Sequence, residues 1–149
     1  STAIAWDCGE LVCSVIDIVK SNGVKTAILD ISIEAHINDC IIMPFVPDVK
    51  NAKQAPKNTK SSNKHFFTLA GNSCLAGDVL GDYMFDDDVS IEIGSKIEIL
   101  NMIHYTMVKT THFNGLNPPN IIAKIKDETN KYVFKRIKKF TFKDYENRL

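Results

Sequence analysis

The sequence lacks an excess of charge of either sign, and this balance narrows the partners that it can have. Lysine and arginine together number 18, and aspartate and glutamate together also number 18. Because a domain dedicated to nucleic acid usually carries a basic excess, we expect no nucleic acid as a partner. No apolar run reaches the roughly 18 residues that a membrane-spanning helix needs, so we expect no membrane segment either.

The sequence also lacks the motifs of common metal and nucleotide sites. None of its four cysteines forms a Cys-x-x-Cys pair, so the cysteine spacing typical of zinc fingers and of redox-active pairs is not present. The glycines at 71, 77 and 81 are not followed by Gly-Lys-Ser/Thr, as a phosphate-binding loop requires. The acidic cluster at 78–88 lacks the alternation of a calcium loop. We therefore predict no metal site.

No secretion signal opens the chain, which begins at Ser1 without a methionine. An even number of cysteines permits two disulfides, but without a signal we expect free thiols in a reducing cytoplasm. The start at Ser1, followed at once by apolar sequence, favours a trimmed chain or a fragment.

Apolar residues make up 44% of the 149, enough for one domain with a core. Short β-branched runs between turn signals predict a mainly β fold, either a barrel or a sandwich. The expected strands cover residues 10–19, 24–32, 40–45, 65–71, 89–102, 103–115, 121–127 and 131–140. A turn at Gly94 and Ser95 interrupts the fifth, whose inner face would carry Ile91, Ile93, Ile97 and Ile99. The last two strands should form a closing hairpin.

Signals for helices and loops are few. Residues 73–84 could hold one or two helical turns, and residues 143–149 a short terminal helix. The stretch 47–64 has five lysines, two prolines and no aromatic residue, so we predict a solvated, mobile loop. This loop could be a basic docking patch for a partner, but a surface insertion without a function of its own is the simpler interpretation. The basic residues at 135–139 favour a protected sheet edge.

Cys74 stands in a glycine-rich turn that leads into the helix expected at 73–84. A thiol at the start of a helix lies at the positive end of the helix dipole, which favours its thiolate. That placement suits a proton donor or a nucleophile. Most free cysteines are small buried hydrophobes, however, so the residues alone leave both interpretations open.

Other polar residues give weaker indications. The aspartates from Asp78 to Asp88 concentrate negative charge near Cys74 and would attract an amine if they line a cleft. Glu34 and His36 have strand-like spacing, so both would face one side, toward a cation or a polar substrate. A solvated loop and a surface strand are simpler explanations of these two groups. Tyr105 lies in an apolar stretch, where its phenol needs a hydrogen-bond partner such as a phosphate.

Several stretches together resemble one family of enzymes. They read GNSCLAGDVLGDYMFDD at 71–87, MIHYTMVKTTHFNG at 102–115 and FTFKDYENRL at 140–149. In order and spacing they are similar to the carboxynorspermidine (carboxyspermidine) decarboxylases, a branch of the alanine-racemase-like, fold III decarboxylases that use pyridoxal phosphate. The stretches AIAWDCGELVCSVIDIV and AILDISIEAHINDCIIMPF extend the resemblance over nearly the whole chain.

The resemblance implies a two-domain enzyme of which this chain is the second part. In that family an N-terminal β/α barrel carries the lysine that forms a Schiff base with pyridoxal 5'-phosphate. A C-terminal β-barrel domain, Greek-key-like with short helices, completes the site. Residues 1–9 match the exit segment of the first barrel, which is otherwise absent here, and residues 10–149 match the second domain.

The same resemblance implies the partners. The family forms a homodimer with shared active sites, so a second copy and the missing N-terminal barrel domain are expected beside a carboxylated polyamine substrate. We expect this chain alone to be inactive, because no lysine in it matches the Schiff-base motif.

The resemblance also implies roles for individual residues. Cys74 matches the cysteine that returns a proton to Cα after carbon dioxide leaves, and a thiol suits this step because its pKa can be tuned toward neutrality. Tyr105 matches the tyrosine that bonds the cofactor phosphate. The stretches that line the substrate side contain Asp78, Glu34, His36 and Asp30. Carboxylates there would orient the cationic amine chain of the substrate.

Two further functions stay open at this point. A non-catalytic interaction module could pair with a full-length decarboxylase and regulate it, although a regulator need not keep Cys74 and Tyr105. A split enzyme would carry its barrel on a separate chain. Carboxynorspermidine and carboxyspermidine differ by one methylene, so the sequence does not separate them as substrates.

Overall fold

Strands β1 (Leu11–Ser21) and β2 (Val24–Leu29) form the first hairpin, as the sequence predicts. The computed structural model describes residues 2–56, 59 and 63–147. At the tip of this hairpin Asn22 and Gly23 have φ angles of 51° and 82°. A tight two-residue turn of the type that matches strand twist needs positive φ at both positions, which explains this Asn-Gly pair.

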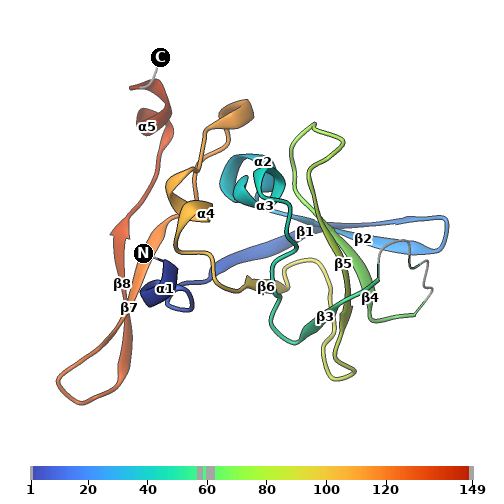
Figure 1. Ribbon diagram of the computed structural model, residues 1–149, viewed down its shortest axis with the longest axis horizontal. Helices are drawn as coiled ribbons and strands as arrows, with labels where there is room; N and C mark the ends of the chain where they lie inside the picture. Colours follow the sequence, from blue (N-terminus) through green and yellow to red (C-terminus); the bar gives the residue numbers. More distant parts are fainter. Residues whose placement is uncertain (1, 57–58, 60–62, 148–149) are drawn as a thin grey trace.

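The hairpin lies inside a six-stranded sheet of order β3-β5-β4-β2-β1-β6. The remaining strands are β3 (Ala52–Gln54), β4 (Phe66–Ala70), β5 (Val79–Phe85) and β6 (Lys96–Ile99). Strands β2 and β4 run parallel, and the other neighbours run antiparallel. Figure 1 shows β1 and β2 crossing the molecule beside β4 and β5.

The two edges of this sheet meet, which closes it into a barrel. Val49, just before β3, pairs with Ile99 of β6. The amide of Lys50 donates to the carbonyl of Glu98 at 3.0 Å, and the amide of Leu100 donates to Asp48 at 2.9 Å. Closure removes the unpaired edges that would otherwise invite aggregation.

The closing segment belongs to the stretch 47–64, for which a solvated loop is predicted. Its first half instead forms β3 and the pairing with β6, because Val49 packs into the core with 3% of its surface exposed. Residues 57–58 and 60–62, where that loop prediction also falls, lie outside the described residues. The predicted mobility of the stretch stays a prediction.

The barrel core comes from alternate residues of the strands, as the period of two along a strand requires. Its members include Cys13, Val15, Leu29, Phe67, Leu69, Leu80, Tyr83, Phe85, Ile97 and Ile99. The phenol of Tyr83 donates to the carbonyl of Pro47 at 2.8 Å, and burial raises the pKa of that phenol. Ile93, predicted on the inner face, is exposed because β6 begins only at Lys96.

Three predicted element types are wrong. Residues 40–45 are not a strand, because α3 (Asp39–Ile42) occupies that stretch. Residues 103–115 form α4 (Tyr105–Val108) and the 3-10 turn η1 (Phe113–Gly115). The helix predicted at 73–84 does not form, because residues from Val79 onward lie between β3 and β4 and pair with both.

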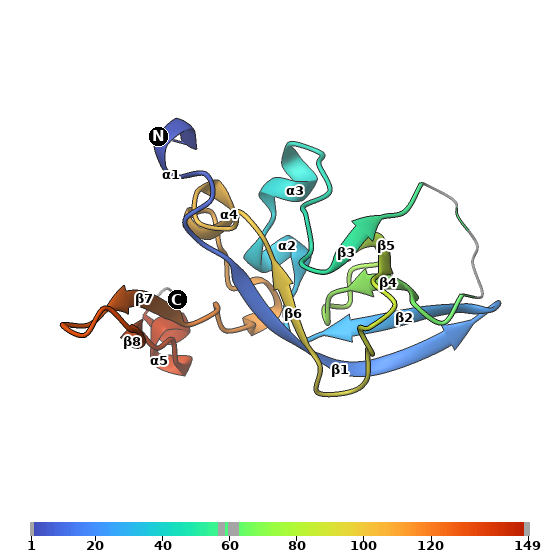
Figure 2. The same cartoon turned by 90° about the horizontal axis from the view of Figure 1, so that it is seen from below.

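The C-terminal part contains the predicted hairpin, β7 (Ile121–Lys126) with β8 (Tyr132–Lys138), and then α5 (Phe142–Glu146). These strands pair only with each other, and Figures 1 and 2 show them standing apart from the barrel. Helix α5 begins with a capping box between Thr141 and Asp144. In the part of the chain that is described, no helix, α1 (Thr2–Ala5) included, has the length and apolar character to cross a membrane.

Candidate active site

The turn between β4 and β5, residues 71–78, carries Cys74 on the surface. The amide of Gly71 donates to the carbonyl of Asp78 at 2.7 Å, and the amide of Asp78 donates to Leu75 at 3.0 Å. Two backbone bonds therefore tie the turn into a compact loop. Because no helix starts at Cys74, the helix dipole invoked from the sequence is not available to its thiol.

Asp78 closes this turn with its side chain. Its Oδ2 accepts from the amide of Ser73 at 3.0 Å. Its Oδ1 accepts from the amide of Ile33 at 2.5 Å, and from the amide of Glu34 and the hydroxyl of Ser32 at 3.2 Å each. With 3% of its surface exposed, the carboxylate is enclosed by donors of the protein.

These donors belong to the start of helix α2 (Ile33–His36), the helix that bears Glu34 and His36. A strand-like spacing is predicted for this pair, and that prediction is wrong because the segment is capped as a helix. The hydroxyl of Ser32 accepts from the amide of Ala35 at 3.1 Å, which is a regular N-cap. The carboxylate of Asp78 satisfies two more of the free amides at the helix start.

His36 is buried and held in one tautomer. Its Nδ1 accepts from the amide of Ser32 at 3.1 Å, so a neutral ring carries its proton on Nε2. Burial lowers the pKa of His36 to about 4, against a smaller opposite effect of Asp78. Within the part of the chain that is described, its Nε2 is enclosed without a hydrogen-bond partner, and so is Oε2 of Glu34. Helix α2 therefore keeps one unused donor and one unused acceptor, both of them enclosed.

Asn114 is a neighbour of Cys74 that the sequence interpretation missed. Its amide Nδ2 donates to Sγ of Cys74 at 3.2 Å. Asn114 has a φ of 57° inside η1, a left-handed conformation that asparagine tolerates better than most residues. The Asn-Gly pair at 114–115 does give a local signal, but only for a turn; the contact with Cys74 spans 40 residues.

The segment from α4 to η1 also packs on α2. The amide of Thr111 donates to the carbonyl of Ala35 at 2.7 Å, and the hydroxyl of Thr110 donates to the carbonyl of His36 at 3.2 Å. In Figure 1, α2, the β4–β5 turn and the end of this segment lie at the same end of the barrel. Cys74, Glu34 and His36 are therefore brought to one end of the molecule.

Tyr105 begins α4 and is exposed, with its phenol open to a partner. The ammonium of Lys109 lies 4.6 Å from the centre of its ring and 2.5 Å from Oδ1 of Asp39. The neighbouring Thr106 is buried, so its hydroxyl is not open to a ligand. The exposed phenol of Tyr105 is a group that could donate to the phosphate end of pyridoxal phosphate.

Asp30 lies apart from the Asp78 contacts. It is exposed just after β2, and its Oδ1 accepts from the amide of Ser14 at 2.7 Å. Its charge still acts on the ring of His36. Hydrogen bonds of Asp78 thus link the Cys74 turn to the start of α2, the helix that bears Glu34 and His36, and Asp30 lies at the margin.

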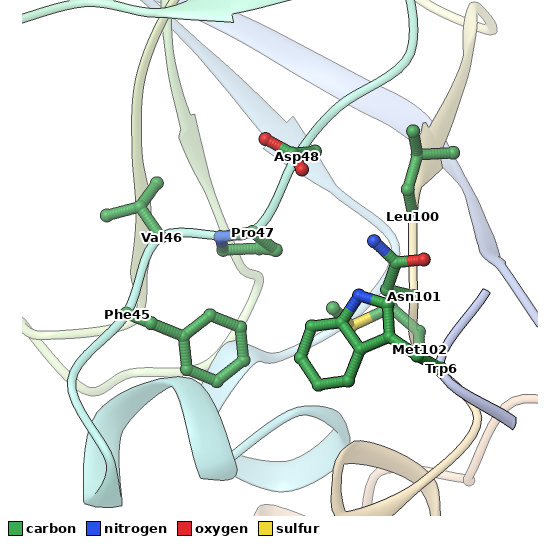
Figure 3. A pocket seen from close by; sticks show the side chains of 8 residues that line it. All are labelled: Trp6, Phe45, Val46, Pro47, Asp48, Leu100, Asn101 and Met102. Atoms are coloured by element: carbon green, nitrogen blue, oxygen red, sulfur yellow. The ribbon is translucent and has the colours of Figure 1, made fainter. Parts of the chain in front are cut away.

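A cavity of about 130 Å³ lies elsewhere, between the N-terminal segment and the barrel. Figure 3 shows Trp6, Phe45 and Met102 around it, with Asp48 at its rim. Trp6 also stacks on His104, with ring centres 4.7 Å apart. None of the predicted site residues is among those that line this cavity, so it is not part of the candidate site.

Comparisons with known proteins identify the family of the chain and its fold. The family model of the pyridoxal-dependent decarboxylase C-terminal sheet domain matches residues 4–102. The chain therefore belongs to this family, and the fold predicted from the resemblance, the C-terminal β-barrel domain of fold III decarboxylases, is confirmed.

Individual relatives show which decarboxylases of this family the chain is similar to. A carboxynorspermidine/carboxyspermidine decarboxylase of Campylobacter jejuni is 45% identical over 98% of this chain and 38% of its own length. A carboxyaminopropylagmatine decarboxylase of Synechocystis is 38% identical over 99% of this chain and 35% of its own. The crystal structure of carboxynorspermidine decarboxylase complexed with norspermidine, from Campylobacter jejuni, gives a TM-score of 0.84 at 42% identity. It is matched over 40% of its length by the whole of this chain, so the chain spans well under half of these relatives.

Proposed function

We propose that the native polypeptide carrying this sequence is a pyridoxal-phosphate-dependent decarboxylase of carboxynorspermidine or carboxyspermidine, acting in polyamine synthesis. The observation that carries the proposal is Cys74, exposed on a turn that is bonded to α2 through Asp78 and to Asn114 through the thiol of Cys74 itself. Cys13 and Cys40 are buried, as thiols that only pack are, and the exposed Cys8 donates within its own segment, to the carbonyl of Ala5. The similarity to the Campylobacter jejuni decarboxylase supports the same assignment.

In this proposal Cys74 supplies the proton that replaces carbon dioxide. The chemistry that pyridoxal phosphate would supply when bound is a sink for the electron pair left by the departing carbon dioxide. The S–H bond of Cys74 breaks, a C–H bond forms at Cα of the product, and a thiolate remains until solvent protonates it. Because Sγ accepts from Asn114, its own proton is free for this transfer.

Tyr105 would hold the cofactor phosphate through its exposed phenol, while Lys109, which lies over its ring, stays paired with Asp39. Glu34 and His36 would meet the substrate. The carboxylate of Glu34 suits a cationic amine, and the neutral ring of His36 offers its Nε2 proton. Asp30 is exposed and would act at a greater distance, toward the far amine of the chain.

Because Cys74 and Tyr105 are exposed, a further protein surface is needed to enclose a substrate against them. We propose that the missing N-terminal barrel domain and a second copy cover it, in a cytoplasmic homodimer with shared sites. The lysine that binds the cofactor would come from that barrel. On this account the 149-residue chain alone has no decarboxylase activity.

The test is release of carbon dioxide by the purified native polypeptide with pyridoxal phosphate. Carboxynorspermidine, carboxyspermidine and carboxyaminopropylagmatine are compared as substrates, and the 149-residue chain is the control. We expect turnover of the first two by the native polypeptide and none by the control. Turnover by the control would refute the proposal that the 149-residue chain carries only part of the active site. No turnover of any substrate by the native polypeptide, although it binds a full-length decarboxylase, would favour a regulatory domain instead.

A further inference from the structure

One buried carboxylate joins the two segments that carry the proposed site, the Cys74 turn to which Asp78 belongs and the start of α2. Asp78 accepts from Ser73 within its own turn, from Ser32 at the N-cap of α2, and from Ile33 and Glu34 at the first positions of α2. The turn and α2 are about 40 residues apart in the sequence, so no local signal links them. Backbone contacts follow the same path, since the amide of Asn72 donates to the carbonyl of Ile31 at 2.9 Å.

Gly71 provides the space for this carboxylate. A Cβ atom at position 71 would lie close against the carboxylate, 2.7 Å from Oδ1 of Asp78. The φ of Gly71 is not in the left-handed region, so the need for glycine here is one of room and not of backbone conformation. The glycine three residues before Cys74 thus serves the carboxylate four residues after it.

The four donors also decide what Asp78 can do. A carboxylate buried to this degree is stabilised only when its oxygens meet donors, and here protein groups supply them. A substrate amine would have to displace bonds that hold α2 and the turn together. Glu34 and Asp30 are less buried than Asp78, so they are better placed to bind the amine of the substrate.

We infer that Asp78 is a positioning residue, which fixes the Cys74 turn against the helix that bears Glu34 and His36. The inference rests on the proposed function for its catalytic consequence. Holding the thiol and the substrate-binding helix at one separation matters because misplacement of a reacting group by about 1 Å can cost about 100-fold in rate.

The variant Asp78→Asn tests this with little change of shape. Its carbonyl oxygen can replace Oδ1 and keep the three donors from Ser32, Ile33 and Glu34. Its NH₂ group then faces the amide of Ser73, donor against donor, so the turn is released while α2 stays capped. Asp82→Asn is the matched control, because Asp82 lies in β5, the strand that follows Asp78, and its carboxylate accepts from the hydroxyl of Thr68 at 2.6 Å, away from the Cys74 turn and α2.

The experiment uses the native polypeptide and measures kcat, KM and amide hydrogen exchange in both variants. For Asp78→Asn we expect kcat to fall about 10- to 100-fold with KM changed less than about threefold. Exchange at the Ser73 amide should accelerate by about tenfold or more, and exchange at Ile33 by less. Asp82→Asn should leave all of these near the wild-type values.

Two results would overturn the inference. A raised KM at unchanged kcat would make Asp78 a substrate ligand, and a lowered melting temperature with wild-type kcat and exchange at Ser73 would make it a general stability residue.

If Asp78→Asn does not fold, Ser32→Ala is the milder variant, since it removes one donor to Asp78 and keeps the charge. It should speed exchange at Ile33 and lower kcat. If the wild type releases no carbon dioxide, the proposed function fails, yet the exchange at Ser73 still decides whether Asp78 joins the two segments.

Discussion

The barrel and the β7–β8 hairpin are built from similar strand sequences and end in opposite environments. The barrel closes through Val49 and buries its inner face, with Leu29, Leu69 and Ile99 fully enclosed. Every residue of β8 is exposed, and Phe134 keeps 73% of its surface in contact with solvent. Figure 2 shows the hairpin beside the barrel, and within the described chain its strands pair only with each other.

This difference shows that alternation alone does not make a stable sheet. A two-stranded hairpin is marginal in water unless another layer covers it. Within the described chain, two lysines of β7 lie near one exposed ring of β8. The ammonium groups of Lys124 and Lys126 lie 4.8 and 5.5 Å from the ring centre of Tyr132. The barrel, in contrast, gains its stability from apolar burial.

The largest effect is expected from a cavity inside the barrel. Leu69→Ala should lower the free energy of unfolding by about 2–5 kcal/mol, because Leu69 is fully buried in the core of a closed sheet. Urea denaturation followed by circular dichroism measures it. Ile122→Ala in β7 is the matched control, since its side chain is more than half exposed. Equal losses for the two variants would mean that the hairpin is as well packed as the barrel.

Acid should weaken the barrel end through His36. Its native pKa of about 4 lies below the ordinary 6.5, so the unfolded chain takes up the proton first as pH falls. The stability contribution is complete above pH 6.5 and is lost as pH falls from there toward 4. At pH 4.5 the loss amounts to about 2–3 kcal/mol.

The variant His36→Gln isolates this effect, because glutamine does not titrate. Its free energy of unfolding should change less between pH 7 and pH 4.5 than that of the wild type. Parallel curves for the two proteins over this range would show that His36 is not the group responsible.

The smallest effect is expected in the hairpin. Phe134→Ser should change the free energy of unfolding of the 149-residue chain by less than about 0.5 kcal/mol, because the side chain has almost no packing to lose. Amide hydrogen exchange in β8 should be fast in the wild type as well as in the variant. A loss above about 1 kcal/mol would reveal a cover over the hairpin and remove the contrast with the barrel.

Local signals in the sequence predict the hairpins well and the short helices poorly. Asn22 with Gly23 and the capping residues Thr141 and Asp144 act within a few positions, so the first hairpin and α5 are predictable. Helices α2, α3 and α4 have four residues each and depend on distant contacts. The bond from Lys109 to Asp39, for example, spans 70 residues.

The site shows the same division. Cys74 stands out in the sequence by its turn and by the family resemblance, and the structure does place it on the surface of a turn. Its neighbour Asn114 and the donors to Asp78 come from segments that only the folded chain brings together. Tyr105 was expected on a strand and instead begins a short helix, yet it is exposed for the role that the resemblance implies.

The proton-donating thiol is the central claim, and Cys74→Ala in the native polypeptide tests it most directly. Turnover of carboxynorspermidine and the identity of the product are measured together for this variant and for Cys8→Ala, the other exposed cysteine. We predict that Cys74→Ala slows turnover by about 100-fold or more, or diverts the proton to another atom and so changes the product, while Cys8→Ala does neither. An unchanged rate with an unchanged product in Cys74→Ala would contradict the account.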